Sequence, residues 1–347
     1  MTISATDKMF EGVPHDLFRV HDWRNDVVTL GTVPAEFVSE ITDGKYSHEY
    51  PVQVNKLVKD GGHDLVISIG QVVPHEVAGM ANHTKNILVG TGGKEAIDQS
   101  HFVGAVYGME NIMGRADNPV RKLYNKAWAD FASDIPVLWM QTVCAKDEAA
   151  NKLAVRGFYT GMGYAPFLAG AELAVKTNFQ MVDEEFTKCV VYLDPEEFET
   201  TWLGNKAIYR TRMAMATGGE LIVLGPAVKR FGEDMGIDAM IRKYGYRTSD
   251  VIVKAVEENE DLRDNLSAAA HLMHGSPEGR FTVTYCPGHI SKEDIESVGF
   301  NYGDLAEMSA KYDVTKLQDG FNDVDGERIF FVSNPALGLW AYRARFD

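Results

Sequence analysis

Cysteine is scarce in this chain of 347 residues. The three cysteines, Cys144, Cys189 and Cys286, are far apart and form no CxxC pair. A disulfide framework is therefore excluded, because such frameworks need paired cysteines at close spacing. An odd, sparse set of this kind is typical of reduced thiols in a cytoplasmic protein.

Long apolar runs and excess positive charge are also missing. No run approaches the roughly 20 residues of a membrane span, and the opening MTISATDKMFEGV contains no apolar signal segment. The 34 basic residues are outnumbered by 50 acidic ones, which gives a formal charge of −16. Because such a surface repels phosphate groups, neither nucleic acid nor a membrane is an expected partner. We predict a soluble, cytoplasmic protein.

The sequence does contain ample material for a packed core. Hydrophobic residues make up 45% of the chain, and its length suits about two domains. Short β-branched runs at 63–74, 85–93 and 134–145 predict buried strands. Apolar residues near a 3.6-residue period predict a helix over 94–114. A helix start is also predicted in 116–133, where Asp117 or Asn118 can cap and Pro119 suits the first helical position.

The second half repeats this alternation of strands and helices at 220–228, 249–275, 280–288 and 328–340. The polar stretch Tyr192–Lys206 interrupts the periodic segments and suggests a boundary. We therefore predict an α/β fold of two domains with mostly parallel sheets flanked by helices and an active site in the cleft between them. Residues 1–198 would form a catalytic and cofactor-binding domain, incomplete at its N-terminus, and residues 199–347 would contribute substrate contacts.

The segment Val72–Phe102 gathers chemically versatile side chains in one place. His75 follows a predicted strand, where α/β sheets position active-site loops, and imidazole exchanges protons near neutral pH. Lys85 carries an amine that can bond to an electrophilic carbon once it is uncharged. His101 lies about two turns into the predicted helix, and neutral imidazole is a good ligand for nickel, zinc or copper.

A glycine cluster lies between the lysine and the last histidine. Gly90, Gly92 and Gly93 form a turn whose backbone N–H groups could cradle a phosphate, although glycines there also simply allow a tight helix start. The P-loop spacing is absent. The stretch HEVAG begins like a zinc-protease helix, but Gly79 replaces its second histidine, so that class is excluded.

Together these residues resemble the nickel-pincer-dependent lactate racemase family. The family has a similar strand followed by P-H-x-x-A-G, a lysine ten residues after that histidine and a metal-binding histidine sixteen residues further on. His75, Lys85 and His101 keep both spacings. The stretches NILVGTGGKEAI and GRADNP are also similar to family segments, and the resemblance extends more thinly into the second half.

The resemblance implies a racemase or epimerase of a 2-hydroxy acid. Its cofactor would be a nickel-bearing pyridinium mononucleotide, joined to Lys85 by a thioamide and delivered by cofactor-biosynthesis proteins. Hydride from C2 of the substrate would pass to the cofactor and return to either face. His75 would exchange the hydroxyl proton and His101 would ligate nickel. A homodimer is one possibility for the assembly.

The sequence departs from the family at three points. In ANHTK, His83 stands where the family has glycine, and a surface imidazole is the simpler interpretation. The upstream G-T-H-R-type and D-H-T-R-P-type motifs are missing, so only one proton acceptor is found where racemisation needs one on each face of the substrate. We expect an N-terminally shortened copy, which an in-frame upstream H-R-P-like string in the genomic DNA would support.

The third departure concerns the substrate carboxylate. The family has a Y-Q-T-V-K-like string in its second domain, and the matching stretch here is YRTRM. Tyr209, Arg210 and Arg212 are therefore the predicted substrate residues, because arginine binds carboxylates bidentately. A sugar acid or a dicarboxylate is then as plausible as lactate. The alternative is that both arginines are solvated surface residues.

Two further histidines, His271 and His274, are three residues apart near the end of a predicted helix. Imidazole is favoured at a helix C-terminus by the helix dipole, so we interpret both as capping residues. Two other function classes remain open. One is a non-catalytic relative that binds a nucleotide or a hydroxy acid, and the other is a zinc or nickel hydrolase that uses His75, His83 and His101.

Overall fold

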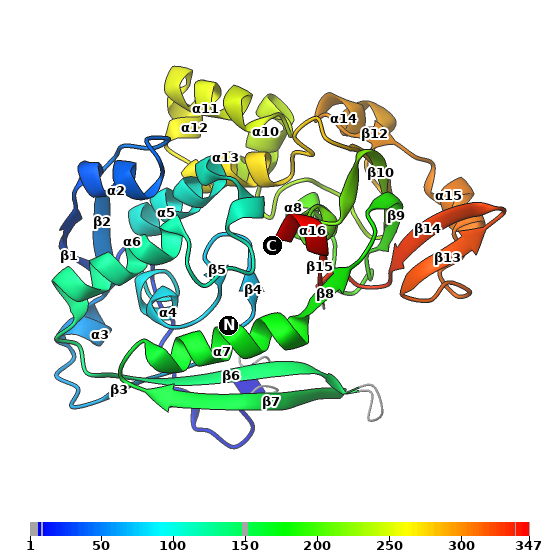
Figure 1. Cartoon of the computed structure of the whole chain (residues 1–347). Coiled ribbons are helices and arrows are strands. Elements are labelled where there is room, and N and C mark those ends of the chain that lie inside the picture. Colours follow the sequence, from blue (N-terminus) through cyan, green and yellow to red (C-terminus); the bar gives the residue numbers. More distant parts are fainter. Residues whose placement is uncertain (1–5, 8–9, 148–151, 337, 347) are drawn as a thin grey trace.

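The computed structural model describes residues 6–7, 10–147, 152–336 and 338–346. In Figure 1 the first half of the chain lies mainly to the left and below, and the second half lies above and to the right. The elements of the first half are β1 (Val27–Val33), α2 (Ala35–Ile41), β2 (Tyr50–Asn55), α3 (Lys56–Asp60), β3 (Val66–Gln71), β4 (Pro74–His75), β5 (Gly79–Met80), α4 (Thr84–Leu88), α5 (Lys94–Tyr107), α6 (Pro119–Ala127), β6 (Val137–Asp147), β7 (Lys152–Gly161), α7 (Ala165–Asn178) and β8 (Phe179–Val182).

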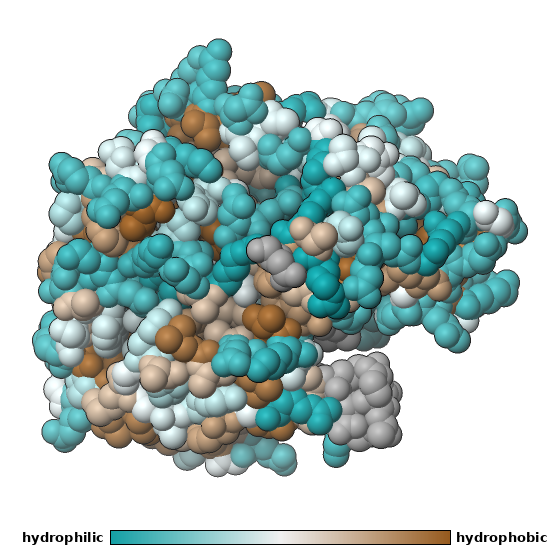
Figure 2. All heavy atoms as spheres, in the orientation of Figure 1, coloured by the Kyte–Doolittle hydropathy of each residue, from teal (hydrophilic) through white to brown (hydrophobic). Residues whose placement is uncertain are grey.

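Small sheets organise the first half. Strands β1 and β2 form an antiparallel pair. Strand β3 runs parallel to β6, which continues as an antiparallel hairpin with β7. Helix α7 packs on β6 and β7. Large apolar side chains remain exposed on β3 and β7, among them Ile69 (71%) and Leu153 (67%), and Figure 2 shows apolar surface along the lower part of the molecule, where this sheet lies.

The second half is built on one six-stranded sheet with the order β12-β11-β10-β9-β14-β13, in which only β13 is antiparallel to its neighbour. Strand β15 pairs with β8 outside this sheet. The elements are β9 (Phe186–Tyr192), α8 (Thr201–Gly204), α9 (Lys206–Thr211), β10 (Met215–Gly225), α10 (Met235–Tyr244), α11 (Ser249–Glu258), α12 (Glu260–Arg263), α13 (Leu266–His274), β11 (Thr282–Pro287), α14 (Lys292–Ser297), β12 (Asn301–Tyr302), α15 (Leu305–Lys311), β13 (Gly320–Val324), β14 (Glu327–Val332), β15 (Leu339–Tyr342) and α16 (Arg343–Phe346).

The predicted fold class is confirmed as a mixed α/β fold with mostly parallel sheets. Local prediction also succeeded where the signals were strong: Asn118 caps α6, with its side-chain oxygen accepting from Arg121 N at 3.0 Å, and Pro119 occupies the first helical position. One predicted strand is wrong. Residues 85–93 form the short helix α4 and a turn, because a short apolar run has no period long enough to distinguish a strand from a buried helix.

The two halves share a hydrophobic interior. The largest core cluster contains Val72 and Phe102 from the first half together with Leu221 and Leu339 from the second. Strand β9 precedes the predicted boundary between residues 198 and 199, yet it lies between β10 and β14 of the six-stranded sheet. The six-stranded sheet therefore includes a strand that begins at Phe186, before the predicted boundary. In the described part of the chain, no helix combines the length and apolar character of a membrane span.

Candidate active site

His75 lies on a tight hairpin at the centre of the molecule, where β4 pairs with β5 (Figure 1). Gly79 has a φ of 74°, and a Cβ there would lie 2.0 Å from the carbonyl oxygen of Arg115, so only glycine fits. The N–H groups of Val77 and Ala78 donate to Nδ1 of His75 at 3.1 and 3.3 Å. These two bonds orient the ring and, because Nδ1 accepts, a neutral ring carries its proton on Nε2.

The residues before Lys85 adopt an unusual backbone conformation. Asn82 and His83 have φ values of 76° and 58°, a region that favours glycine. The side chain of His83 is 4% exposed and packs on Trp139, with ring centroids 4.4 Å apart, and against Tyr164. The prediction of a surface imidazole at His83 is therefore wrong. Burial lowers the pKa of His83 to about 3, so its ring is neutral.

A buried arginine beneath this segment holds the segment in place. Arg121, on α6, donates to the carbonyl oxygens of Met80 and Asn82 and to Oγ1 of Thr84. Burial lowers the pKa of Arg121 to about 10, which leaves it charged at neutral pH. Burial, together with this positive charge, lowers the pKa of the Lys85 amine, against the opposing effect of Glu76. Lys85 therefore loses its proton more readily than an ordinary lysine.

His101, on α5, is oriented by its own helix. Its Nδ1 lies 2.7 Å from the carbonyl oxygen of Ile97, so Nδ1 donates and Nε2 keeps its lone pair. Burial lowers the pKa of His101, which maintains the neutral form. A neutral imidazole whose remote nitrogen is held by a carbonyl is the usual arrangement of a histidine that ligates a metal.

The glycine turn has a packing explanation. Added Cβ atoms would lie 2.5 Å from Asn86 O at Gly90, 2.0 Å from Leu88 O at Gly92 and 2.3 Å from the Gln53 side-chain oxygen at Gly93. Two amides at the start of α5 are already bonded: Lys94 N donates to Trp23 O and Ala96 N donates to Gln53. Phosphate binding at this turn remains a prediction, with fewer free donors than the sequence suggested.

Helix α9 brings second-half residues to the β4–β5 hairpin. Arg210 donates from Nη1 to the carbonyl oxygen of Pro74 at 3.3 Å, while its Nε is buried without a partner. The hydroxyl of the buried Tyr209 is 2.7 Å from Nδ1 of His271. Arg210 thus directs a guanidinium group, with an unused donor, toward the residues around His75.

Arg212 has a different environment. Its Nε lies 3.0 Å from a carboxylate oxygen of Glu110, which Arg280 also contacts at 2.8 Å. Its Nη1 donates to the carbonyl oxygen of His274 at 2.9 Å. Arg212 is buried and Arg210 is half-buried, so the alternative of two solvated surface arginines is wrong. These contacts give Arg212 a role in joining the halves, and a contact with substrate remains a prediction.

Three residues of this region, Glu76, His271 and His274, were missed or misread in the sequence. The Glu76 carboxylate lies near His75, Arg210 and His274. Burial raises its pKa, but its interactions with these three residues and a backbone hydrogen bond lower the pKa on balance. His274 is buried, and burial lowers its pKa to about 3, so its neutral ring lacks the charge that the helix dipole would favour. The capping interpretation is also wrong for His271, which hydrogen-bonds to tyrosines. The signal that could have identified Glu76 was its position next to His75 in the sequence.

These side chains influence one another electrostatically. Burial lowers the pKa of His75 to about 3, Glu76 opposes this shift, and Lys85, His101 and Arg210 add to it. The structure therefore brings His75, Lys85, His101 and Arg210 into one neighbourhood around Glu76. The glycine turn lies apart, at the opposite end of α4 from Lys85.

A conventional metal centre is not formed here. In the ranges that the structure describes, no group of three or more His, Cys, Asp or Glu side chains could hold a metal ion. His83 packs in an aromatic environment with Trp139, Tyr164 and Phe167. The hydrolase alternative, which requires His75, His83 and His101 as a shared ligand set, therefore has no structural support.

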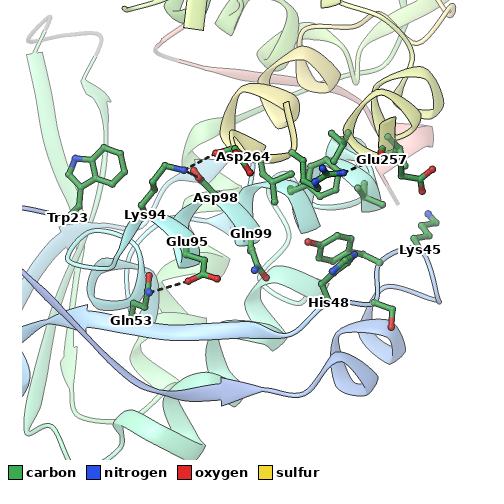
Figure 3. A pocket seen from close by; sticks show the side chains of 18 of the residues that line it. Trp23, Lys45, His48, Gln53, Lys94, Glu95, Asp98, Gln99, Glu257 and Asp264 are labelled. Atoms are coloured by element: carbon green, nitrogen blue, oxygen red, sulfur yellow. Dashed lines mark hydrogen bonds and ion pairs between the residues drawn. The ribbon is translucent and has the colours of Figure 1, made fainter. Parts of the chain in front are cut away.

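A separate cavity of about 860 Å³ lies between α5 and the helices α11–α13 (Figure 3). The predicted site residues do not line it. Several of its polar groups are paired: Lys94 bonds to Asp98 at 2.6 Å and to the Asp264 carbonyl at 3.0 Å, and Gln53 lies 3.5 Å from Glu95. The Lys94–Asp264 bond links α5 to the residues just before α13.

The chain is similar to known proteins in part of its sequence and in its fold. Residues 39–113, which contain His75, Lys85 and His101, match the family model of the lactate racemase N-terminal domain. A crystal structure of a Thermotoga maritima protein is 25% identical, with a TM-score of 0.80, and the match covers 99% of this chain and 83% of that one. The lactate racemase apoprotein of Thermoanaerobacterium thermosaccharolyticum is 16% identical, with a TM-score of 0.70 and coverage of 98% and 75%, and shows the fold alone. No curated protein matches the sequence.

The buried neutral histidines predict acid sensitivity. Burial lowers the pKa of both His83 and His271 to about 3, whereas each returns to about 6.5 on unfolding. The unfolded chain therefore binds more protons below pH 6.5, and each residue's contribution to stability is present above that pH and lost as the pH falls toward 3. We expect the free energy of unfolding to drop by about 1.4 kcal/mol per pH unit for each histidine, measured by urea unfolding from pH 7.5 to 5.

In the same urea series, His83→Gln should reduce the change in the free energy of unfolding per pH unit by the contribution of one histidine. It should also lower the free energy of unfolding at pH 7.5. The exposed His289 provides the control, because His289→Gln should leave the slope unchanged. An identical slope for the wild type and His83→Gln would contradict the assignment.

Proposed function

We propose, from the premise that residues 39–113 belong to the lactate racemase N-terminal domain family, that this protein is a racemase or epimerase of a 2-hydroxy acid. The observation that carries the proposal is the meeting of His75, Lys85 and His101 around Glu76, with Arg210 reaching the same hairpin from the second half. A proton-exchanging ring, an amine and a metal ligand are the protein groups that this chemistry requires.

The residues fit a nickel-pincer pyridinium mononucleotide. Burial lowers the pKa of the Lys85 amine, which favours the uncharged form that thioamide formation needs. His101 offers its Nε2 as a single protein ligand, because its Nδ1 is held by the Ile97 carbonyl. The lack of a three-residue metal group within the described ranges agrees with a metal whose other ligands come from the cofactor. When bound, such a cofactor would supply a ring that accepts the substrate's C2 hydrogen together with its two electrons.

Arg210 is suited to binding the substrate carboxylate. Its Nε is a buried donor without a partner, and an unpaired buried donor is costly unless a ligand uses it. The Pro74 carbonyl holds one terminal nitrogen, which orients the guanidinium beside His75. A carboxylate there would have its C2 substituents near the imidazole, as orientation of the reacting groups demands.

His75 would exchange the hydroxyl proton through Nε2. At rest Nδ1 accepts from two amides, so Nε2 carries the proton and can donate to a ligand oxygen. Accepting a proton at Nε2 requires the other tautomer, with the proton on Nδ1. The ring must then turn away from the N–H groups of Val77 and Ala78. Before it accepts the proton, the ring is neutral, because burial lowers its pKa.

Covalent attachment tests the proposal directly. When the protein is produced together with cofactor-biosynthesis proteins, we expect bound nickel and an intact-mass adduct on Lys85. Lys85→Ala should remove the adduct completely, whereas Lys122→Ala, at an exposed lysine paired only weakly with Asp117 at 3.6 Å, should keep it. Nickel without an adduct would contradict the proposal, and a protein with neither would instead favour a non-catalytic relative.

The carboxylate assignment has a kinetic test. The loaded protein is incubated with single-enantiomer 2-hydroxy acids, including lactate, a sugar acid and a dicarboxylate, and optical rotation is followed. We expect rotation to decay to zero for one class, and Arg210→Lys to raise the KM for that acid by about 10- to 100-fold, because lysine cannot reproduce the bidentate contact. An unchanged KM would remove Arg210 from the carboxylate site.

A further inference from the structure

The two histidines of α13 have opposite hydrogen-bonding states. His271 is saturated: Nδ1 is 2.7 Å from the Tyr209 hydroxyl, Nε2 is 3.0 Å from the Tyr246 hydroxyl, and the ring stacks on Trp202. His274 is 6% exposed, and its Nε2 is buried with no partner among the described residues. Since buried polar atoms are nearly always bonded, an unpaired one indicates a missing ligand or a functional group.

The position of His274 is well defined. Its carbonyl oxygen accepts from Arg212, which is anchored to Glu110. Its ring lies 6.1 Å from that of Tyr209, at an edge-to-face angle of 77°. The backbone and ring of His274 are therefore fixed by the protein, while its Nε2 is left available.

The charges around His274 are those of the candidate active site. The Glu76 carboxylate raises its pKa, while the charges of Arg212 and His101 and, above all, burial lower it. Glu76 and His101 also act on His75. His75 belongs to the β4–β5 hairpin of the first half, and His274 ends α13 of the second half, which packs on the His101-bearing α5. The two imidazoles thus approach the Glu76–His101 region from different halves of the molecule.

We propose that His274 is a second catalytic residue of this site, and that its Nε2 takes up the hydroxyl proton of the substrate enantiomer that His75 does not serve. This inference rests on the proposed function and deepens it. Of the neighbouring polar groups, the Tyr209 hydroxyl is already bonded to His271. On α13, His274 is the imidazole with an unengaged nitrogen, and it would supply the second proton acceptor that racemisation requires.

The proposed step balances in protons and electrons. The substrate O–H bond breaks and its proton goes to Nε2 of one imidazole. A bound cofactor would accept the C2 hydrogen with the electron pair of the broken C2–H bond and would return both to the opposite face of the 2-oxo acid. The oxygen of that 2-oxo acid would take a proton from the other imidazole. The imidazoles exchange their protons with water between turnovers, so no external oxidant or reductant is required.

The first test uses the protein without cofactor, and its readout is thermal stability. Because Nε2 of His274 has no hydrogen-bond partner among the described residues, His274→Phe should leave the melting temperature within about 2 °C of the wild type or raise it. His274→Gln should behave similarly. The matched change His271→Phe removes two hydrogen bonds and should lower it clearly. A loss of stability for both His274 variants equal to that of His271→Phe would show a structural role and overturn the proposal.

The second test probes ligand contact with oxalate, a planar dianion that resembles the carboxylate and carbonyl of a 2-oxo acid. Calorimetry on the cofactor-free protein should show binding that weakens at least 10-fold in His274→Phe and is unchanged in His289→Gln. Equal affinity in the wild type and His274→Phe would overturn the proposal. Absence of binding in the wild type would count against the carboxylate site itself, and therefore against the proposed function.

The third test uses the protein loaded with cofactor, with the Lys85 adduct confirmed by mass. In single turnovers, His274→Phe should form 2-oxo acid from one enantiomer at a rate within a few-fold of the wild type and from the other at least 100-fold more slowly. His75→Phe should show the opposite preference. Equal losses for both enantiomers, or none, would overturn the role of His274 and leave the proposed racemase function standing.

Discussion

The packing of α5 against α13 is the interaction on which the candidate site depends. Helix α5 carries His101 and α13 carries His271 and His274, so their contact joins the metal-ligand candidate of the first half to the imidazoles of the second. Lys94 bonds to the Asp264 carbonyl at one end of this contact. At the other end, Glu110 binds both Arg212 and Arg280. A shared apolar core fills the space around it, so the halves cannot separate without exposing apolar surface.

Burial shifts the pKa values of the side chains near the contact between α5 and α13. Transfer of a charged group away from water favours its neutral form, which lowers the pKa of His75, His101 and His274 and of the Lys85 amine. Glu76 and Arg210 remain as opposite charges within the cluster. The result is a set of neutral imidazoles and an amine with a lowered pKa beside the opposite charges of Glu76 and Arg210. This environment suits proton exchange and metal ligation better than an exposed surface would.

Arg121 and His83 hold the segment that precedes Lys85 in place. The guanidinium of Arg121 binds three oxygens of the segment that precedes Lys85, and His83 fills an aromatic pocket beneath the same segment. His83 and Asn82 occupy backbone conformations that glycine adopts more easily. Burial of the histidine ring thus helps to hold this backbone conformation.

Local signals in the sequence were sufficient for the α/β class, for most strands and helices, and for the spacing of His75, Lys85 and His101, because periodicity, caps and motif spacing are properties of neighbouring residues. They failed at 85–93, where the apolar run was too short to show a period, and at His83, whose burial depends on Trp139, a residue far along the chain. The difference between His271 and His274 lay beyond the sequence as well, since both are histidines on one helix. Only the tertiary structure decided that Tyr209 and Tyr246 saturate the first and leave Nε2 of the second unpaired, because hydrogen-bond partners are supplied by folding and not by adjacency in the chain.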